Sequence, residues 1–204
     1  MTWRKRQKLV RDLAEGLAKA GALQFGTFTL PDGMESSYFI NLRGLPSYPG
    51  VYGLVIGAMG DLLSTKAPKA NAIFAASGTG LTIASPLAVS LKKPMAYTRM
   101  WGQGSGKAVE GEVRPGWDLV VVDDLATSGK SILTSAKAVE VAGGEVKHAA
   151  VVIDRLEGAR ERLSKEGITL HCVTDVMELA DTLASMELIS QRDLKAITKS
   201  VGGR

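Results

Sequence analysis

The stretch over residues 119–131, LVVVDDLATSGKS, constrains the fold of this chain more than any other stretch. It begins with four apolar residues, which are typical of a strand buried on both faces of a parallel sheet. Asp123 and Asp124 follow where such a strand would leave the sheet at its carboxyl end. A short loop of Thr, Ser and Gly then leads into a helical pattern over 132–141. This combination favours a bound phosphate, because the first N–H groups of a helix have no internal partners and the helix dipole attracts an anion there.

The two carboxylates narrow the class of ligand. Asp123 and Asp124 would repel a phosphate that carried nothing else. They are useful only if the ligand also offers hydroxyl groups or a bound divalent metal, and a ribose 5-phosphate has that combination. The alternative is an ordinary buried strand followed by an Asx-type turn and a helix N-cap.

The end of the stretch, SGKS over 128–131, also resembles the tail of a nucleotide-binding P-loop. That motif requires a glycine at position 124, where the backbone wraps closely around phosphates. This chain has Asp124 there. The sequence therefore excludes a P-loop.

Length and composition indicate one α/β domain. The 204 residues are enough for a single well-buried domain. We predict one domain over 1–204, in which an N-terminal helix and hairpin over about 1–45 form a small hood. The net charge of +4 suits a small anionic ligand but is too low and too scattered to indicate nucleic acid.

Cysteine, histidine and hydropathy patterns add three expectations. The single cysteine, Cys172, cannot form an internal disulfide, so we expect a reducing compartment and a small buried side chain. His148 and His171 show no zinc-ligand spacing. No apolar run approaches the length of a membrane span. We therefore expect a cytoplasmic enzyme without a membrane partner.

Hydrophobic periodicity and turn residues predict alternating strands and helices. Helices are predicted over 4–19, 49–63, 81–91, 132–141, 157–166, 175–183 and 191–201. Strands are predicted over 25–30, 38–41, 72–75, 95–99, 119–122, 146–154 and 168–173. Asp175 is the predicted N-cap of the helix that follows it. The order predicts a doubly wound, mostly parallel sheet.

Ligands of such sheets bind outside the carboxyl ends of the strands. We therefore expect three loops to meet there, over 76–80, 100–111 and 123–131, together with Arg155. The segment over 100–111 is rich in glycine and predicted to be a loop. Loops of this length usually have a function, so we expect one here, and the alternative is a hairpin tip without a function.

Several segments carry a family resemblance. Residues 119–131 resemble the phosphoribosyl-diphosphate (PRPP) motif of type I phosphoribosyltransferases. The segments 22–30 (ALQFGTFTL), 37–41 (SYFIN) and 152–160 (VIDRLEGAR) are similar to the orotate phosphoribosyltransferase branch of that family. The resemblance covers roughly residues 20–185. It implies a type I phosphoribosyltransferase fold, and transfer of ribose 5-phosphate from PRPP to orotate, which gives orotidine 5′-monophosphate and pyrophosphate.

The resemblance also implies roles for individual residues. Asp123, Asp124 and Arg99 would be catalytic, and the two aspartates would hold the ribose hydroxyls and, directly or indirectly, Mg²⁺. The implied PRPP and phosphate ligands are Gly78, Thr79, Lys107, Ala126, Thr127, Ser128, Gly129, Lys130 and Ser131. The implied orotate ligands are Phe39, Ile40, Thr127 and Arg155. Family members commonly form homodimers, so the resemblance implies one here.

Arg155 has an alternative role, an ion pair with Glu157 at the surface. If Arg155 instead binds the carboxylate of orotate, its presence argues against a phosphoribosyltransferase that acts on a neutral base, because a neutral base would offer the guanidinium no anionic partner.

The chain departs from the family where lysines usually neutralise pyrophosphate. Pro31, Thr79 and Met100 stand where lysines are common, and residues 101–103 replace the usual loop Lys and His. Arg99 and Lys107 are the cations that remain nearby. Two hypotheses follow: an active orotate phosphoribosyltransferase with an altered pyrophosphate site, or a catalytically impaired or regulatory relative that binds PRPP or a nucleotide.

Overall fold

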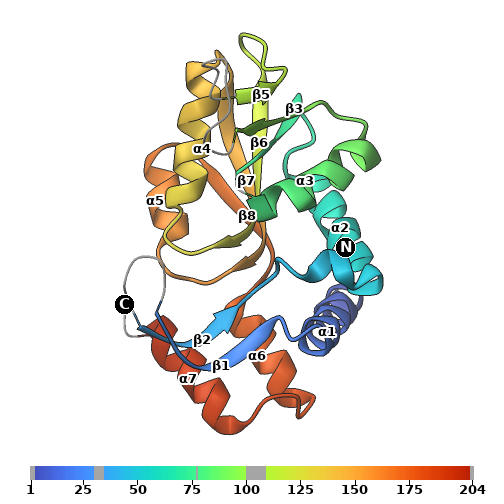
Figure 1. Cartoon of the computed structure of the whole chain (residues 1–204), viewed down its shortest axis with the longest axis vertical. Coiled ribbons are helices and arrows are strands. Elements are labelled where there is room, and N and C mark those ends of the chain that lie inside the picture. The colour runs from blue at the N-terminus through green and yellow to red at the C-terminus, as the bar shows by residue number, and fades with distance from the viewer. Residues whose placement is uncertain (1–2, 30–34, 77, 100–108, 203–204) are drawn as a thin grey trace. The chain divides into compact units, whose positions relative to one another are not determined.

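The computed structural model divides the chain into two compact units (Figure 1). One unit comprises Met1–Val55 and Thr174–Arg204, and the other comprises Ile56–Val173. The residues that the structure describes are 3–29, 35–76, 78–99 and 109–202. Among these residues, no helix is both long enough and apolar enough to cross a membrane.

The described part of the second unit contains a mostly parallel sheet of six strands in the order β5-β4-β3-β6-β7-β8. The strands are β3 (Ala72–Ala75), β4 (Met95–Thr98), β5 (Val109–Gly111), β6 (Asp118–Ala126), β7 (Glu145–Asp154) and β8 (Thr169–Asp175). The pairs β4–β3, β3–β6 and β6–β7 are parallel, whereas β5 runs antiparallel to β4. The mostly parallel α/β sheet predicted from the sequence is confirmed.

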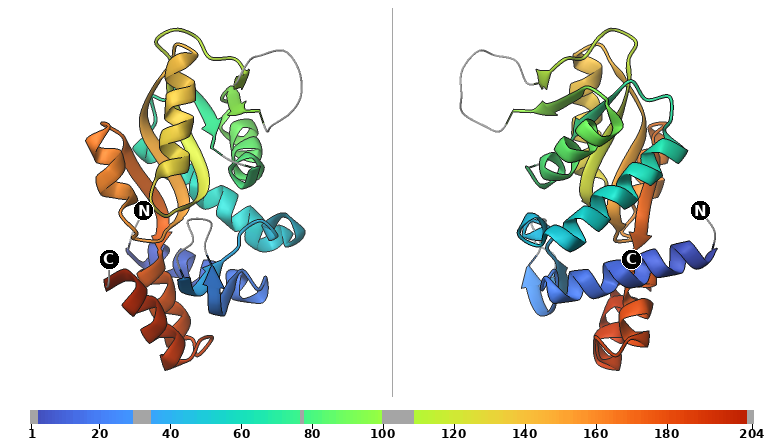
Figure 2. Two further views of the ribbon diagram at one scale, coloured as in Figure 1. Left: turned by 60° about the vertical axis from the view of Figure 1, so that its left-hand side comes forward. Right: turned by 90° about the vertical axis from the view of Figure 1, so that its right-hand side faces the viewer.

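Helices cover both faces of this sheet (Figure 2). They are α3 (Gly78–Leu91), α4 (Lys130–Val141), α5 (Ala159–Lys165) and the later turns of α2 (Pro49–Lys66). Phe74, Val121 and Ala149 lie side by side on neighbouring strands and belong to the hydrophobic cluster that includes residues of α4 and α5. The residues one step along, such as Ile73 and Val120, point to the opposite face and are equally buried. Burial on both faces explains why these strands read as continuous apolar runs.

The first unit pairs a two-stranded antiparallel sheet with helices. Its elements are α1 (Trp3–Lys19), β1 (Leu23–Thr29), β2 (Glu35–Ile40), the short 3₁₀ helix η1 (Leu45–Ser47), α6 (Val176–Ser185) and α7 (Gln191–Gly202). Helix α1 buries Val10, Leu13 and Leu17 along one stripe and contacts α6, to which Arg6 is tied by an ion pair with Glu178 at 2.6 Å. The predicted N-cap is confirmed: the carboxylate of Asp175 accepts from the first backbone N–H groups of α6.

Three predicted boundaries were wrong. Strand β6 does not end before the two aspartates but continues to Ala126, because Leu125 and Ala126 still pair with β7. Helix α3 begins at Gly78, three residues earlier than predicted, so part of the expected loop is helical. Residues 109–111, predicted as loop, form the edge strand β5.

The two histidines that looked isolated in the sequence meet on neighbouring strands. His148 Nδ1 of β7 lies 3.2 Å from His171 Nε2 of β8. Burial, followed by the charges of His148, Lys66 and Arg160, lowers the pKa of His171.

Gly80 lets α3 pack closely against the end of β6. A Cβ atom at this position would lie 2.8 Å from the backbone oxygen of Val122 and 3.0 Å from Oδ1 of Asp123. The Val122 oxygen belongs to the backbone of the sheet, and Oδ1 of Asp123 is held by the hydrogen bond from the backbone N–H of Asp124. The glycine therefore sets how near the first turn of α3 comes to the aspartates.

We predict that Gly80→Ala lowers the free energy of unfolding by about 1–3 kcal/mol, the usual cost of an overpacked contact. The matched control is Gly57→Ala in α2, where a Cβ atom would meet nothing within 4 Å. That control should gain about 0.5–1 kcal/mol from the better helix propensity of alanine. Denaturant unfolding measures both variants, and equal stability of the two would contradict the close approach.

Candidate functional site

The second unit brings most of the predicted site residues to the carboxyl edge of its sheet. Strands β3, β4, β6 and β7 run in the same direction, so the residues that end them lie at one edge. Two contacts confirm the proximity. The first turn of α3 approaches Asp123 at Gly80, and the backbone N–H of Arg155 donates to the oxygen of Ala126 at 2.9 Å.

Asp123 is the buried anchor of this edge, with 3% of its surface exposed. Its Oδ1 accepts from the backbone N–H of Asp124 at 3.0 Å, and its Oδ2 accepts from the hydroxyl of Ser131 at 3.1 Å. The carboxylate therefore connects the end of β6 to the first turn of α4 and fixes the loop between them.

Asp124 has a strongly perturbed acidity. Burial, followed by the charge of Asp123 and a hydrogen bond with it, raises the pKa of Asp124 to about 7. The carboxyl of Asp124 in an empty site is therefore about half protonated at neutral pH. A ligand that brings hydroxyl donors or a cation would favour its ionised form. Such perturbed pairs are typical of functional sites.

The loop between the strand and α4 has the features of a phosphate cradle. Gly129 is the N-cap of α4 with a φ of 76°, a left-handed conformation that glycine adopts without strain. It has no side chain that could cap the helix. Ala126 is buried, Thr127 and Ser128 are half-buried, and Lys130 and Ser131 are exposed on the first turn. The first turn of α4 contains no acidic residue of its own and carries a lysine, which suits an anion.

Arg155 lies at the end of β7 but in a different environment from the one predicted. Its side chain is 3% exposed, and Nη2 lies 3.0 Å from Oε1 of Glu157, whose side chain is 4% exposed. The ion pair considered in the sequence is therefore present, but it is buried rather than at the surface. A buried guanidinium with an acidic partner keeps a fixed orientation.

The end of β7 also contains an acid that the sequence analysis missed. Asp154 is fully buried and accepts from the backbone N–H of Leu156 at 2.9 Å and from Nε of Arg160 at 2.6 Å. Arg160 also reaches Sγ of Cys172, so the cysteine is half-buried beside a cation rather than a plain core residue. Its position directly before Arg155 is the sequence signal that could have identified Asp154.

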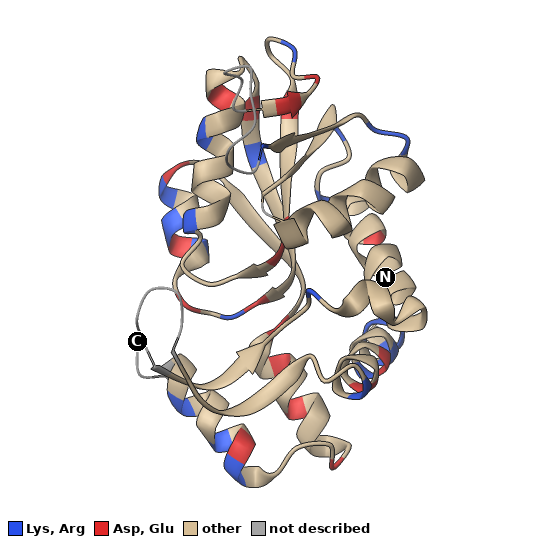
Figure 3. Cartoon of the chain, in the orientation of Figure 1, with Lys and Arg blue, Asp and Glu red and all other residues tan. Residues whose placement is uncertain are grey.

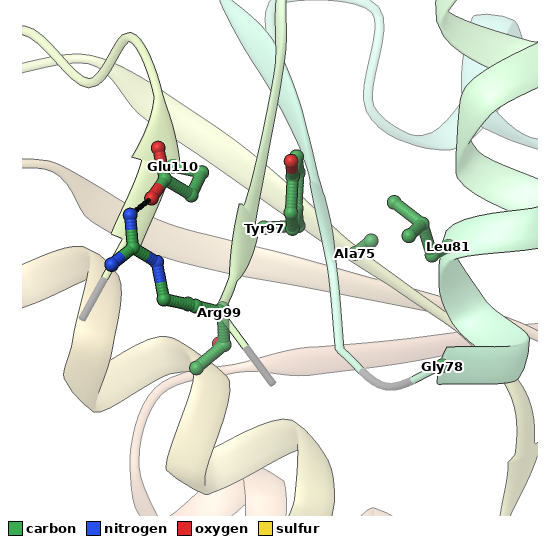
Figure 4. Close-up of a pocket in the computed structure, with 7 residues that line it drawn as sticks. Ala75, Gly78, Leu81, Tyr97, Arg99 and Glu110 are labelled. Atoms are coloured by element: carbon green, nitrogen blue, oxygen red, sulfur yellow. Dashed lines mark hydrogen bonds and ion pairs between the residues drawn. The ribbon is translucent and has the colours of Figure 1, made fainter. Parts of the chain in front are cut away.

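Arg99 and Glu110 form an ion pair beside a pocket of about 300 Å³ (Figure 4). The pocket is lined by Ala75, Gly78, Leu81, Tyr97, Thr98, Arg99 and Glu110. Thr79, in the first turn of α3, is half-buried, and its backbone oxygen accepts from Thr82. The pocket thus joins the start of α3 to the base of the β4–β5 connection.

The other predicted residues belong to the first unit or lie outside the described residues. Phe39 and Ile40 lie on β2 of the first unit, where Phe39 stacks on Phe28 and Ile40 is buried. Lys107, Pro31 and the substituted positions 100–103 lie outside the described residues. The roles of these residues in orotate or pyrophosphate binding stay predictions.

Comparison with known proteins gives the family. No family model matches the chain. Orotate phosphoribosyltransferase of Cenarchaeum symbiosum is 40% identical over 177 residues, which cover 85% of this chain and 88% of that protein. The chain belongs to the orotate phosphoribosyltransferase family.

Solved structures agree with this assignment. Orotate phosphoribosyltransferase from Aeropyrum pernix is similar with a TM-score of 0.75 and 33% identity, over 84% of this chain and 99% of that one. The Mycobacterium tuberculosis enzyme in complex with PRPP has a TM-score of 0.64 and 26% identity, over 84% of this chain and 98% of that one. These similarities confirm the type I phosphoribosyltransferase fold that the resemblance implied.

We predict that Asp124 makes the stability of the empty protein fall as the pH rises. Its pKa is about 7 in the folded state and about 3.9 in an unfolded chain. At pH values between these two pKa values, the folded state keeps a proton on Asp124 that the unfolded chain has lost. The free energy of unfolding therefore falls as the pH rises, until the pH passes the folded pKa. Asp124→Asn removes this loss.

Thermal unfolding from about pH 5 to about pH 9 tests the sign of the linkage. The melting temperature of Asp124→Asn minus that of the unmodified protein should increase with pH. Asp61→Asn, at an exposed position on α2, is the control and should give a flat difference. A flat difference for Asp124→Asn as well would contradict the raised pKa.

Proposed function

We propose that this chain transfers ribose 5-phosphate from PRPP to orotate, as an enzyme of pyrimidine nucleotide biosynthesis. The observation that supports this most strongly is the carboxyl edge of the sheet, where a buried aspartate pair adjoins a helix start suited to phosphate. A family relative has been solved in complex with PRPP, which supports PRPP as the ligand of this edge.

The site performs the reaction by positioning and electrostatics. The loop over 126–131 and the start of α4 hold the 5′-phosphate, and Asp124 accepts from a ribose hydroxyl. Asp123 keeps the loop and strand in register through its bonds to Asp124 and Ser131. A ring nitrogen of orotate then forms a bond to C1 of the ribose while the bond to pyrophosphate breaks. Positive charge grows on the sugar and negative charge on the leaving group, so no covalent nucleophile is needed.

The residues present fit Mg²⁺. Asp123 and Asp124 carry carboxylate oxygens, the ligand type that this ion prefers. Burial, followed by the charge of Asp123, raises the pKa of Asp124, and a nearby cation would favour the ionised form. Among the described residues there is no group of three or more metal-binding side chains. When bound, Mg²⁺ would be held near these two carboxylates together with oxygens of PRPP, and it would supply positive charge to balance that of the diphosphate.

We also propose a cytoplasmic homodimer. The described residues of α3 are all uncharged, and Val89 on this helix is 81% exposed (Figure 3). We propose that this uncharged helix lies on the face that a second subunit covers. The mass in solution, measured by light scattering, distinguishes dimer from monomer.

We predict that the purified protein consumes orotate when PRPP and Mg²⁺ are both supplied. The ultraviolet absorbance of orotate follows the reaction, and reverse conversion of orotidine 5′-monophosphate with pyrophosphate should also proceed. Addition of a chelator should abolish turnover, and excess Mg²⁺ should restore it. Binding of orotidine 5′-monophosphate without any turnover would instead establish a catalytically impaired nucleotide-binding relative.

We predict that Arg155 determines the affinity for orotate. Removing Arg155 alone would leave Glu157 as a buried charge without its partner, at a cost of about 3–5 kcal/mol. The test therefore replaces both members of the pair, with Arg155→Gln and Glu157→Gln together. The affinity for orotate should fall about tenfold or more, the usual loss of a charge-assisted hydrogen bond.

Calorimetry on the double variant measures orotate and PRPP separately. The affinity for PRPP should stay within about twofold, since the loop over 126–131 is unchanged. Equal losses of both affinities would contradict the assigned role of Arg155. Thermal unfolding checks that the double variant is folded.

A further inference from the structure

The ion pair between Arg99 and Glu110 closes the base of the β4–β5 connection. Arg99 is the first residue after β4, and Glu110 is the middle residue of β5. Glu110 lies opposite Tyr97 in the antiparallel pair, two residues before Arg99, so both side chains project from the same face of the sheet. Figure 4 shows the guanidinium of Arg99 turned toward the carboxylate of Glu110.

Both members of the pair are partly exposed at the pocket. The side chain of Arg99 is 29% exposed and that of Glu110 is 35% exposed. Within the described residues, the remaining pocket lining is uncharged, so the two side chains cancel each other's charge. The first turn of α3, through Gly78, contributes the positive end of a helix dipole.

This charge balance is unusual for a site that must accept a diphosphate. The diphosphate of PRPP carries several negative charges, and Arg99 is the cation among the described residues that line this pocket. A carboxylate beside it both repels the diphosphate and competes for the guanidinium. Yet the same carboxylate holds a long side chain in one place, where it would otherwise sample many rotamers.

We propose that Glu110 is a positioning residue for Arg99, which holds the guanidinium at the pocket and yields it to the diphosphate of PRPP. This inference rests on the proposed function. The carboxylate keeps Arg99 aligned in the empty enzyme. Binding of the diphosphate then replaces one anionic partner of the guanidinium with another.

A purely structural ion pair would behave differently. It would only tie β5 to the end of β4, and its loss would reduce stability without changing the affinity for any one ligand. If Glu110 instead gives up Arg99 to the diphosphate, replacing Glu110 must change the affinity for ligands that carry a diphosphate. Ligands that carry the 5′-phosphate but no diphosphate should not respond.

The test compares the unmodified protein with Glu110→Gln in calorimetric titrations with inorganic pyrophosphate, PRPP and orotidine 5′-monophosphate. Glutamine keeps the length of the side chain and an oxygen that accepts from Arg99, but it removes the negative charge. Pyrophosphate and PRPP should bind about fivefold more tightly, as expected for the loss of one charge a few ångströms away. The affinity for orotidine 5′-monophosphate should be unchanged.

The matched control is Glu112→Gln. Glu112 pairs with Arg114 at 2.8 Å in an exposed position two residues along the chain and does not line the pocket. This variant should bind all three ligands as the unmodified protein does. Steady-state kinetics adds a second readout: Glu110→Gln should lower KM for PRPP, and Glu110→Ala, which lacks the oxygen acceptor, should show a lower kcat than Glu110→Gln.

Three outcomes decide the proposal. Tighter binding of pyrophosphate and PRPP, with unchanged binding of orotidine 5′-monophosphate, supports the exchange. Unchanged or weaker pyrophosphate binding by a folded Glu110→Gln protein overturns it while the proposed function stands. If the unmodified protein binds neither PRPP nor pyrophosphate, both the exchange and the proposed function are overturned.

Discussion

The site depends on one buried carboxylate. Asp123 lies in the second half of β6 with almost no exposed surface, and both of its oxygens accept hydrogen bonds within the protein. A buried charge is tolerated only when hydrogen bonds replace its lost hydration. The bonds to Asp124 and Ser131 do this, and they also hold the strand end and the start of α4 together. Gly80 completes the arrangement, because any side chain there would displace this carboxylate.

The two halves of the proposed PRPP site handle charge in different ways. Near the proposed 5′-phosphate position, the start of α4 supplies backbone donors and Lys130, and it contains no acidic residue of its own. At the diphosphate end, the cation Arg99 is already neutralised by Glu110. Binding at the first half draws on a preformed cradle, whereas binding at the second requires an exchange of partners. Preorganised donors stabilise charge at lower cost than donors that must first be released.

Periodicity predicted the sheet, the helices and the motif at the end of β6, because buried parallel strands and amphipathic helices leave strong patterns. It missed β5, since Val109–Gly111 is too short to show alternation. It ended β6 too early, because Asp123 and Asp124 look like loop residues until the hydrogen bonds of β7 are known. The distance between Asp123 and Ser131 likewise depends on how the loop closes, which no local pattern encodes.

The two arginines proposed for substrate binding share a principle that the sequence could not reveal. Arg155 is paired with Glu157, and Arg99 with Glu110, so each guanidinium has an acidic partner before any ligand arrives. The difference lies in burial. The Arg155 pair is almost fully buried, so separating it is costly, and a ligand must share the guanidinium. The Arg99 pair is partly exposed, so water can solvate the carboxylate of Glu110 when a diphosphate replaces it as the partner of Arg99. Burial, more than residue type, therefore decides whether an acidic neighbour fixes an arginine permanently or holds it until an anionic substrate binds.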